Sequence, residues 1–172
     1  CVDQFGVADN MTERLAALAC LVNSPFTDEA QEALKRFAER FSEDPIVMDQ
    51  WFSVQAAAVV PSGLERVTHL LEHPAFSIKN PNKVRAVIGA FSMQNTPNFH
   101  AEDGSGYAFL ADKVIELDAL NPQIAARIIS PLTRWQRYDL HHQELMLVQL
   151  KRIKNSGELS ADLFEVLEKS LV

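Results

Sequence analysis

Apolar residues recur every three or four positions along most of this chain, which is the spacing of one face of an α-helix. Clear examples are Leu15, Leu18 and Val22; Leu34, Phe37, Ala38 and Phe41; and Val84, Val87, Ile88 and Phe91. A looser form follows at Leu145, Val148 and Ile153. The alternation of apolar and polar residues that is typical of a β-strand is nearly missing. The pattern therefore predicts an all-α protein.

Many of the predicted helices begin at a residue whose side chain can cap free backbone N–H groups. Asn10 with Glu13, and Ser62 with Glu65, have the spacing of a capping box. Four further starts place a capping residue before a proline, which suits the first position of a helix: Asp44-Pro45, Asn80-Pro81, Asn121-Pro122 and Ser130-Pro131. These residues predict helix starts independently of the apolar spacing.

Together the two signals predict about ten helices, with bounds good to about three residues. Their ranges are 10–22, 28–42, 45–58, 63–72, 81–93, 106–118, 122–130, 132–138, 140–154 and 160–171. Because most connections are short, consecutive helices should pack as antiparallel hairpins. We expect a curved α-solenoid of the armadillo or HEAT type, and a compact orthogonal bundle is the alternative. The longest break, from Asn95 to Ser105, should be an ordered loop rather than a domain linker.

The composition fits one soluble globular domain, with 172 residues of which 47% are hydrophobic and 23% charged. A net charge of -7 argues against a nucleic-acid-binding protein. Residues 1–78 contain 12 acidic and 5 basic side chains, whereas residues 79–172 contain 11 of each. The second half is therefore richer in Arg and Lys for local sites. No apolar run approaches the ~18–20 residues needed to span a bilayer, so no membrane anchor is expected.

Two cysteines, Cys1 and Cys20, are too few for a disulfide scaffold and fit a reducing compartment. Cys20 lies in an apolar run and is predicted to be a small buried residue. No signal peptide is visible. The chain begins with Cys rather than Met, which suggests a piece of a longer polypeptide.

One short match to a metallopeptidase motif occurs at His69-Leu-Leu-Glu-His73. Histidines four positions apart share a helix face and could bind zinc, with Glu72 as general base. However, Pro74 places the motif in the last turn of a helix, where histidine suits the negative end of the helix dipole. The sequence favours a coincidental match.

Other polar groups have structural interpretations that are stronger than catalytic ones. Asp139 should cap a helix and leave His141 and His142 near its exposed start. The side chains of His100, Glu102 and Asp103 could bind a cation, although satisfying backbone groups of their own loop is favoured. Ser105, between Gly104 and Gly106, matches only part of the nucleophile-elbow motif and lacks the preceding strand.

Two arginine settings stand out, although an arginine in such a setting is by itself more often part of a solvated face or a structural ion pair. Gln123 and Arg127 share a polar helix face, with Ser130 and Arg134 nearby if the helix tolerates Pro131. Arg85 is off the apolar stripe of its helix and lies one turn from Gly89. A glycine inside a helix costs roughly 0.8–1.0 kcal/mol relative to alanine. Gly89 therefore predicts close approach by another backbone or side chain.

Several longer motifs occur in an order and spacing that resemble a known family. They are Ala8-Asp-Asn-Met-Thr-Glu-Arg14, Asp44-Pro-Ile-Val-Met-Asp-Gln-Trp51, Asn80-Pro-Asn-Lys-Val-Arg85, His100-Ala-Glu-Asp-Gly-Ser-Gly-Tyr107, Asn121-Pro-Gln-Ile-Ala-Ala-Arg127 and Arg137-Tyr-Asp139. Together they resemble the C-terminal helical domain of bacterial aminopeptidases N, which are zinc metallopeptidases. The resemblance covers nearly the whole chain and implies the same superhelix.

The resemblance also implies a role. Residues 1–172 would be a single, non-catalytic domain that encloses the active-site chamber and controls peptide access. Arg85, Gln123 and Arg127 match family positions that line the cavity. The family's zinc-binding H-E-x-x-H is absent from these residues. Zinc and the catalytic groups would therefore belong to another domain of the same cytoplasmic polypeptide, and the fragment alone should be inactive and bind no metal.

The expected partners are that catalytic domain and peptide substrates, with neither nucleic acid nor membrane. Two alternatives stay open. One is a stand-alone helical-repeat scaffold that binds proteins through its concave face. The other is a small peptidase that uses His69 and His73.

Overall fold

The computed structural model describes residues 1–171, and within this range all regular structure is helical. The first half contains α1 (Val2–Val7), α2 (Met11–Val22), α3 (Thr27–Phe41), α4 (Pro45–Ala56), α5 (Gly63–Leu71), α6 (Pro81–Val84), the π-helical segment η1 (Arg85–Gly89) and α7 (Ala90–Gln94). The second half contains α8 (Thr96–Phe99), α9 (Ser105–Asp118), α10 (Pro122–Ile128), the 3-10 segment η2 (Leu132–Arg137), α11 (Leu140–Lys154) and α12 (Ala161–Ser170).

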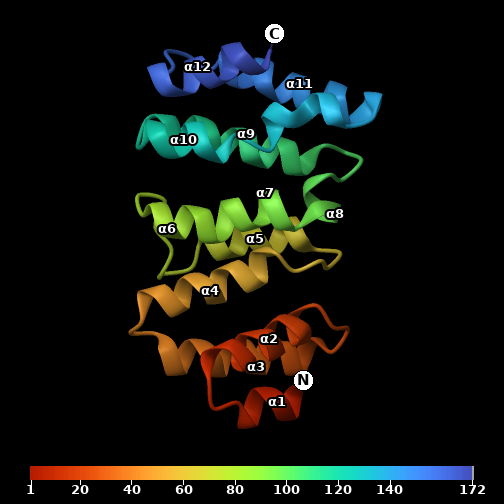
Figure 1. Ribbon diagram of the computed structural model, residues 1–172, viewed down its shortest axis with the longest axis vertical. Coiled ribbons are helices and arrows are strands. Elements are labelled where there is room, and N and C mark those ends of the chain that lie inside the picture. Colours follow the sequence, from red (N-terminus) through yellow and green to blue (C-terminus); the bar gives the residue numbers. More distant parts are fainter. Residues whose placement is uncertain (172) are drawn as a thin grey trace.

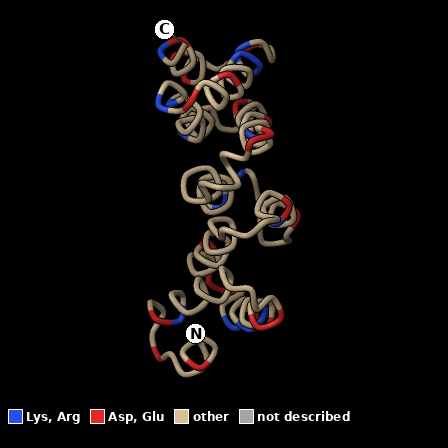
Figure 2. The backbone as a smooth tube through the Cα atoms, turned by 90° about the vertical axis from the view of Figure 1, so that its right-hand side faces the viewer, with Lys and Arg blue, Asp and Glu red and all other residues tan. Residues whose placement is uncertain are grey.

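The helices form a stack of layers along the long axis of the molecule. They run crosswise to this axis, with α1 at one end and α12 at the other (Figure 1). In a view turned by 90° about the long axis, many helices are seen nearly end-on, one above another (Figure 2). Contacts follow the same order: α1 packs on α2 and α3, α4 packs on the α6–η1–α7 helix, and α10 packs on η1, α9 and α12. The predicted all-α solenoid is therefore confirmed, and the compact bundle is wrong.

Most of the predicted helix caps are present. The side chains of Asn10, Asp44, Asn80, Asn121 and Asp139 each accept a hydrogen bond from a backbone N–H in the first turn of their helix. Two predicted caps are wrong. Ser62 has φ -98° and ψ 32°, outside the extended geometry that directs a capping hydroxyl at the first turn, and its side chain makes no cap bond. Ser130 caps nothing because the chain continues from α10 through a further turn into η2.

Several elements differ from the sequence-based prediction. The helix α1 was missed because it is short and buries only Phe5. The predicted 95–105 loop contains the four-residue helix α8, which is too short to produce a periodic pattern. The predicted helix 81–93 includes one π turn, and the predicted helix 132–138 is a 3-10 segment. Hydrogen bonding that differs from the regular α pattern leaves no signature in residue types.

The hydrophobic core runs through every layer of the stack. Fully buried aromatic side chains include Phe52, Phe91 and Tyr107, each 0% exposed. Cys20 is exposed, so its predicted burial is wrong. The buried face of α2 is formed by Ala17, Leu18, Leu21 and Val22, and Cys20 lies off that face. Among the described helices, none is long and apolar enough to cross a membrane.

Candidate functional site

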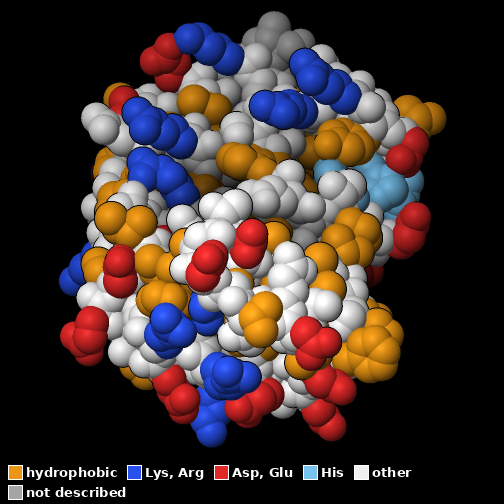
Figure 3. Space-filling view, turned by 60° about the horizontal axis from the view of Figure 1, so that its bottom comes forward, with side chains coloured by type: hydrophobic (Ala, Val, Ile, Leu, Met, Phe, Trp, Pro, Cys, Tyr) orange, Lys and Arg blue, Asp and Glu red, His pale blue; other side chains and the backbone are white. Residues whose placement is uncertain are grey.

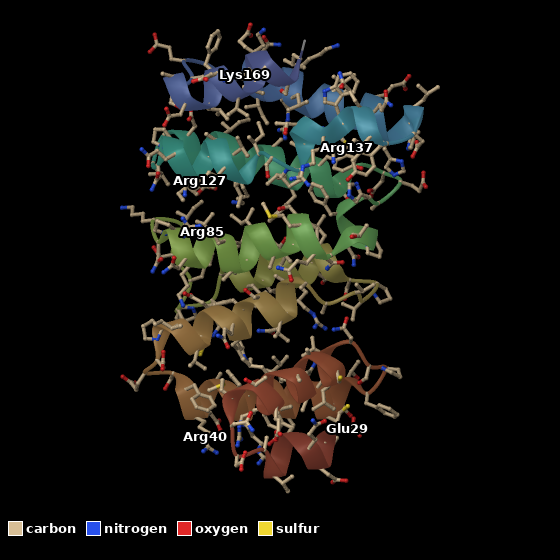
Figure 4. All side chains as sticks on the ribbon, in the orientation of Figure 1. Glu29, Arg40, Arg85, Arg127, Arg137 and Lys169 are labelled. Carbon is tan, nitrogen blue, oxygen red and sulfur yellow. The ribbon has the colours of Figure 1, made fainter. Side chains whose placement is uncertain are left out.

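Arg85, Gln123 and Arg127 lie on two neighbouring elements. Arg85 begins η1, and the other two belong to α10, which packs directly on η1. All three side chains are exposed. Figure 4 shows Arg85 and Arg127 on the same side of the stack, one layer apart. The fold thus brings the two predicted arginines, 42 positions apart in the sequence, onto one side of adjacent layers.

Arg85 is the first residue of a π-helical segment. Such segments are rare insertions in α-helices and are frequent at functional sites. The Arg85 guanidinium Nη1 donates a hydrogen bond to Asn82 Oδ1 at 3.0 Å. Arg85 also lines a groove of about 590 Å³ formed with α2 and α4, together with Asp49 and Gln50. The guanidinium is therefore held locally while remaining accessible from the groove.

The predicted close approach at Gly89 is only partly correct. A β-carbon at Gly89 would lie 3.4 Å from Ile128 Cδ1 of α10, which is ordinary van der Waals contact. Alanine would therefore fit. A position that does require glycine is Gly106, where a β-carbon would lie 2.7 Å from Phe99 Cα. Sequence reasoning missed this contact.

Arginines in and after α10 give this part of the molecule a basic character. Within residues 1–171, Arg127, Arg134 and Arg137 form no ion pair, in contrast to Arg152, which lies 2.6 Å from Asp112. In Figure 3, Lys and Arg side chains gather on the upper part of the face. Unpaired guanidinium groups attract carboxylates and carbonyl oxygens.

Ser130 and Arg134 do not join Gln123 and Arg127 in one cavity. They line a separate groove of about 300 Å³ between α7, α8 and η2. Met93, Thr96, His100 and Tyr138 also line it. We call this cavity the Arg134 groove. The separation arises because the chain changes from α-helix to 3-10 geometry around Pro131.

The family model described as a domain of unknown function with ARM repeats (DUF3458_C) matches residues 1–172. The chain belongs to this ARM-repeat family. It is 43% identical to aminopeptidase N of Escherichia coli K12 over 98% of this chain, and 42% identical to aminopeptidase N of Haemophilus influenzae over 97%. It spans 19% of the length of each of these two relatives. The predicted resemblance to aminopeptidase N is confirmed.

A crystal structure of Legionella pneumophila aminopeptidase A in complex with aspartic acid contains a closely similar domain. The TM-score is 0.92 at 38% identity, and the match covers 98% of this chain and 20% of that one. The ARM-repeat chain is therefore homologous to a domain of aminopeptidases.

The described residues of the ARM-repeat chain do not provide a ligand set for zinc. Within residues 1–171, no group of three or more His, Cys, Asp or Glu side chains is arranged to hold a metal ion. His73 instead packs against the rings of Trp51 and Phe52, with centroids 5.2 and 5.4 Å away, and its Nδ1 accepts a hydrogen bond from Ala75 N. His69 is exposed, and its Nδ1 bonds to the carbonyl oxygen of Glu65. Burial, and next the charge of Lys83, lower the pKa of His73.

Three other histidines join the loop before α9 to the start of α11. His142 Nδ1 lies 2.6 Å from Asp139 Oδ2, and its Nε2 lies 3.2 Å from the His100 carbonyl oxygen. The hydrogen bond that His142 Nδ1 donates to the Asp139 carboxylate is the main reason that the pKa of His142 is raised. His141 Nε2 bonds to the Glu102 carbonyl oxygen at 2.8 Å. These contacts hold the loop against α11.

Within the loop itself, Asp103 Oδ1 accepts a hydrogen bond from the backbone N–H of Ser105. This contact matches the structural interpretation of the loop. His141 Nε2 and His142 Nε2 likewise bond to backbone carbonyl oxygens of the loop, so these contacts act mainly on its conformation.

Proposed function

We propose that residues 1–172 form the C-terminal ARM-repeat domain of a larger, cytoplasmic zinc aminopeptidase. In this role the domain encloses the active-site chamber and controls the access of peptides. The observation that carries the proposal is the pair of exposed guanidinium groups of Arg85 and Arg127 on one side of adjacent layers. The relatives support it, since each named one is an aminopeptidase in which this region is about a fifth of the chain.

The chemistry of this domain is recognition. Guanidinium groups present several N–H donors in a fixed plane, which suits peptide carbonyl oxygens and carboxylates. Arg85 and Arg127 would bind the part of the peptide distal to the cleaved bond, and the Gln123 amide could donate to a carbonyl oxygen beside them. Zinc and the groups that hydrolyse the bond would come from the catalytic domain, which is the expected partner within the same polypeptide.

The proposal is tested by kinetics on the complete enzyme. Arg85→Ala and Arg127→Ala should lower kcat/KM for tri- and tetrapeptides by about 10-fold, the lower end expected for losing a charge-assisted hydrogen bond in a wet chamber. A single-residue amide lacks the distal part, so its kcat/KM should change little. Zinc content should stay the same.

Arg40→Ala is the matched control, because Arg40 is an exposed arginine in α3, near the opposite end of the stack (Figure 4). It should leave all substrates unaffected. Equal kinetics for wild type, Arg85→Ala and Arg127→Ala at every peptide length would refute the proposed role. An upstream reading frame without H-E-x-x-H would instead favour a protein-binding scaffold.

A further inference from the structure

The Arg134 groove shares no lining residue with the groove of about 590 Å³ beside Arg85. It combines side chains from α7, the α8 region and η2, which are brought together only by the stacking of two layers. Its lining contains Arg134 and three hydroxyl groups, those of Thr96, Ser130 and Tyr138, that have no hydrogen-bond partner within residues 1–171. No Asp or Glu lines it. The free polar groups can therefore all act as donors.

The tautomer of His100 adds one more donor. Tyr107 is 0% exposed, and the one hydrogen-bond partner of its hydroxyl among the described residues is His100 Nδ1, at 2.6 Å. A buried hydroxyl that donates to nothing costs about 1–3 kcal/mol. The Tyr107 hydroxyl therefore donates to Nδ1, and the neutral His100 ring carries its proton on Nε2.

Two observations keep His100 in that state. Burial is the main reason that the pKa of His100 is lowered, so the ring stays neutral near pH 7. The Tyr138 ring lies against the His100 ring with centroids 4.5 Å apart and fixes its plane. Within residues 1–171 the Nε2–H group has no acceptor, and His100 lines the groove.

We propose that the Arg134 groove is a carboxylate-binding subsite for a peptide, with Arg134 supplying the charge and Thr96, Ser130, Tyr138 and His100 supplying further donors. A guanidinium matches a carboxylate through two parallel hydrogen bonds. A volume of about 300 Å³ is at the small end of ligand pockets and suits a single residue. Met93, which is 56% exposed, supplies an apolar surface for the stem of that residue.

The carboxylate could belong to the peptide's C-terminus or to an Asp or Glu side chain, and both present the same group. The inference rests on the proposed function, because the chamber is what would deliver peptides to the groove. It assigns a subsite separate from Arg85, Gln123 and Arg127.

The test measures binding, not turnover, on the complete polypeptide that carries this domain. The probe is N-acetyl-tetraalanine as free acid and as C-terminal amide, titrated calorimetrically. Acetylation removes the free amine that an aminopeptidase needs. Wild type should bind the acid about 10-fold more tightly than the amide, the lower end for a charge-assisted hydrogen bond. A second pair of amidated peptides, with Asp or Asn at the third position, tests the side-chain source.

Arg134→Gln should abolish the preference for the carboxylate-bearing probe and leave the affinity for the neutral probe unchanged. Tyr138→Phe keeps the ring on His100 and should reduce the preference by about 3-fold, as for one neutral hydrogen bond. Arg137→Gln is the matched control, because Arg137 is an exposed arginine of the same 3-10 segment outside the groove. It should retain the full preference.

A wild type without carboxylate preference in either pair, or an Arg134→Gln variant that retains it, would overturn the subsite. Preference only in the acid–amide pair assigns the C-terminus, and preference only in the Asp–Asn pair assigns a side chain. Failure of the proposed function is seen separately, as a polypeptide without aminopeptidase turnover that still shows, or lacks, the Arg134-dependent preference.

Discussion

Gly106, in the first turn of α9, packs directly on the backbone of Phe99. A β-carbon at Gly106 would lie 2.7 Å from Phe99 Cα and 2.8 Å from its carbonyl carbon. Phe99 is itself 0% exposed and ends α8, so the backbone has little freedom to move away. This contact fixes the turn that connects the two halves of the stack and leads into the loop of His100.

Gly106→Ala should therefore destabilise the chain by about 2–3 kcal/mol, because overpacking against a fixed backbone forces local shifts. Urea denaturation monitored by circular dichroism gives the free energy of unfolding. Gly6→Ala is the control, since no atom lies within 4 Å of a β-carbon there and Gly6 is in a helix. It should be neutral or stabilising by up to about 1 kcal/mol. Equal stability of the Gly106→Ala variant and wild type would contradict the contact.

A second prediction concerns the ion pair between α6 and α4. Lys83 Nζ lies 2.7 Å from Asp49 Oδ1, and the two side chains are 7% and 21% exposed. Lys83 Nζ also donates to the Pro45 carbonyl oxygen and lies 5.1 Å from the Phe52 ring centroid. Lys83→Met should cost about 2–3 kcal/mol, because it leaves the Asp49 carboxylate half-buried and without its counter-charge.

The double variant Lys83→Met/Asp49→Asn should recover at least about 1 kcal/mol relative to Lys83→Met, measured by the same denaturation. The exposed pair Lys35–Glu39, at 4.0 Å, is the control, and Lys35→Met should change stability by less than about 0.5 kcal/mol. If the losses in free energy of unfolding of Lys83→Met and of Asp49→Asn alone add up to the loss in the double variant, the pair contributes nothing.

Local chemistry explains which parts of the fold the sequence predicts. The Asp44-Pro45, Asn80-Pro81 and Asn121-Pro122 starts depend on neighbouring residues only, and all three caps form. The Ser62 cap fails because tertiary packing decides the geometry there, with Gly63 pressed against the Asn98 side chain. The π turn at η1 depends on packing in the same way and has no residue signature.

The candidate site residues likewise include some that the sequence predicts and others that only tertiary packing brings together. Resemblance to a family predicted Arg85, Gln123 and Arg127, and the fold places them on adjacent elements. The Arg134 groove needs residues 92–100 to meet residues 130–138 across two layers. No spacing within either segment could have predicted that meeting. The partnership of His100 with the buried Tyr107 hydroxyl likewise depends on the close contact at Gly106.

A third prediction concerns Asn95, a fully buried amide that joins α4 to the turn between α7 and α8. Its Nδ2 donates to the carbonyl oxygens of Ala56, at 3.1 Å, and Ala58, at 2.8 Å. Asn95→Asp keeps the shape but replaces both donors with a buried charge, so it should cost about 3 kcal/mol or more. Asn155→Asp, at an exposed helix end, should cost well under about 1 kcal/mol. Similar unfolding midpoints for the two variants would rule out the role of Asn95.

The last prediction concerns the pH dependence of stability through His142. Its pKa is raised, mainly by the hydrogen bond with Asp139, so its contribution is fully present below the unfolded value of about 6.5 and is lost as the pH rises through the folded pKa. The pKa of Asp139 is lowered, mainly by the His142 backbone N–H, so its contribution is present above about 3.9 and is lost as the pH falls through the folded pKa. The pair should therefore stabilise the chain most between about pH 4 and 6.5.

The difference in Tm between wild type and His142→Gln should accordingly be largest near pH 5.5 and shrink as the pH rises above about 6.5. A difference is needed because burial lowers the pKa of His73, whose contribution is lost as the pH falls and is the same in both proteins. The pKa of His100 is lowered mainly by burial and next by the charge of His142, so only the burial effect cancels in the difference. The Glu102 charge also raises the pKa of His142, but less than Asp139 does. In an Asp139→Asn background, His142→Gln should change Tm by an amount that depends only weakly on pH. A Tm difference that grows from pH 5.5 to 8 would show that His142 is stabilised as the neutral ring, contrary to the contact with Asp139.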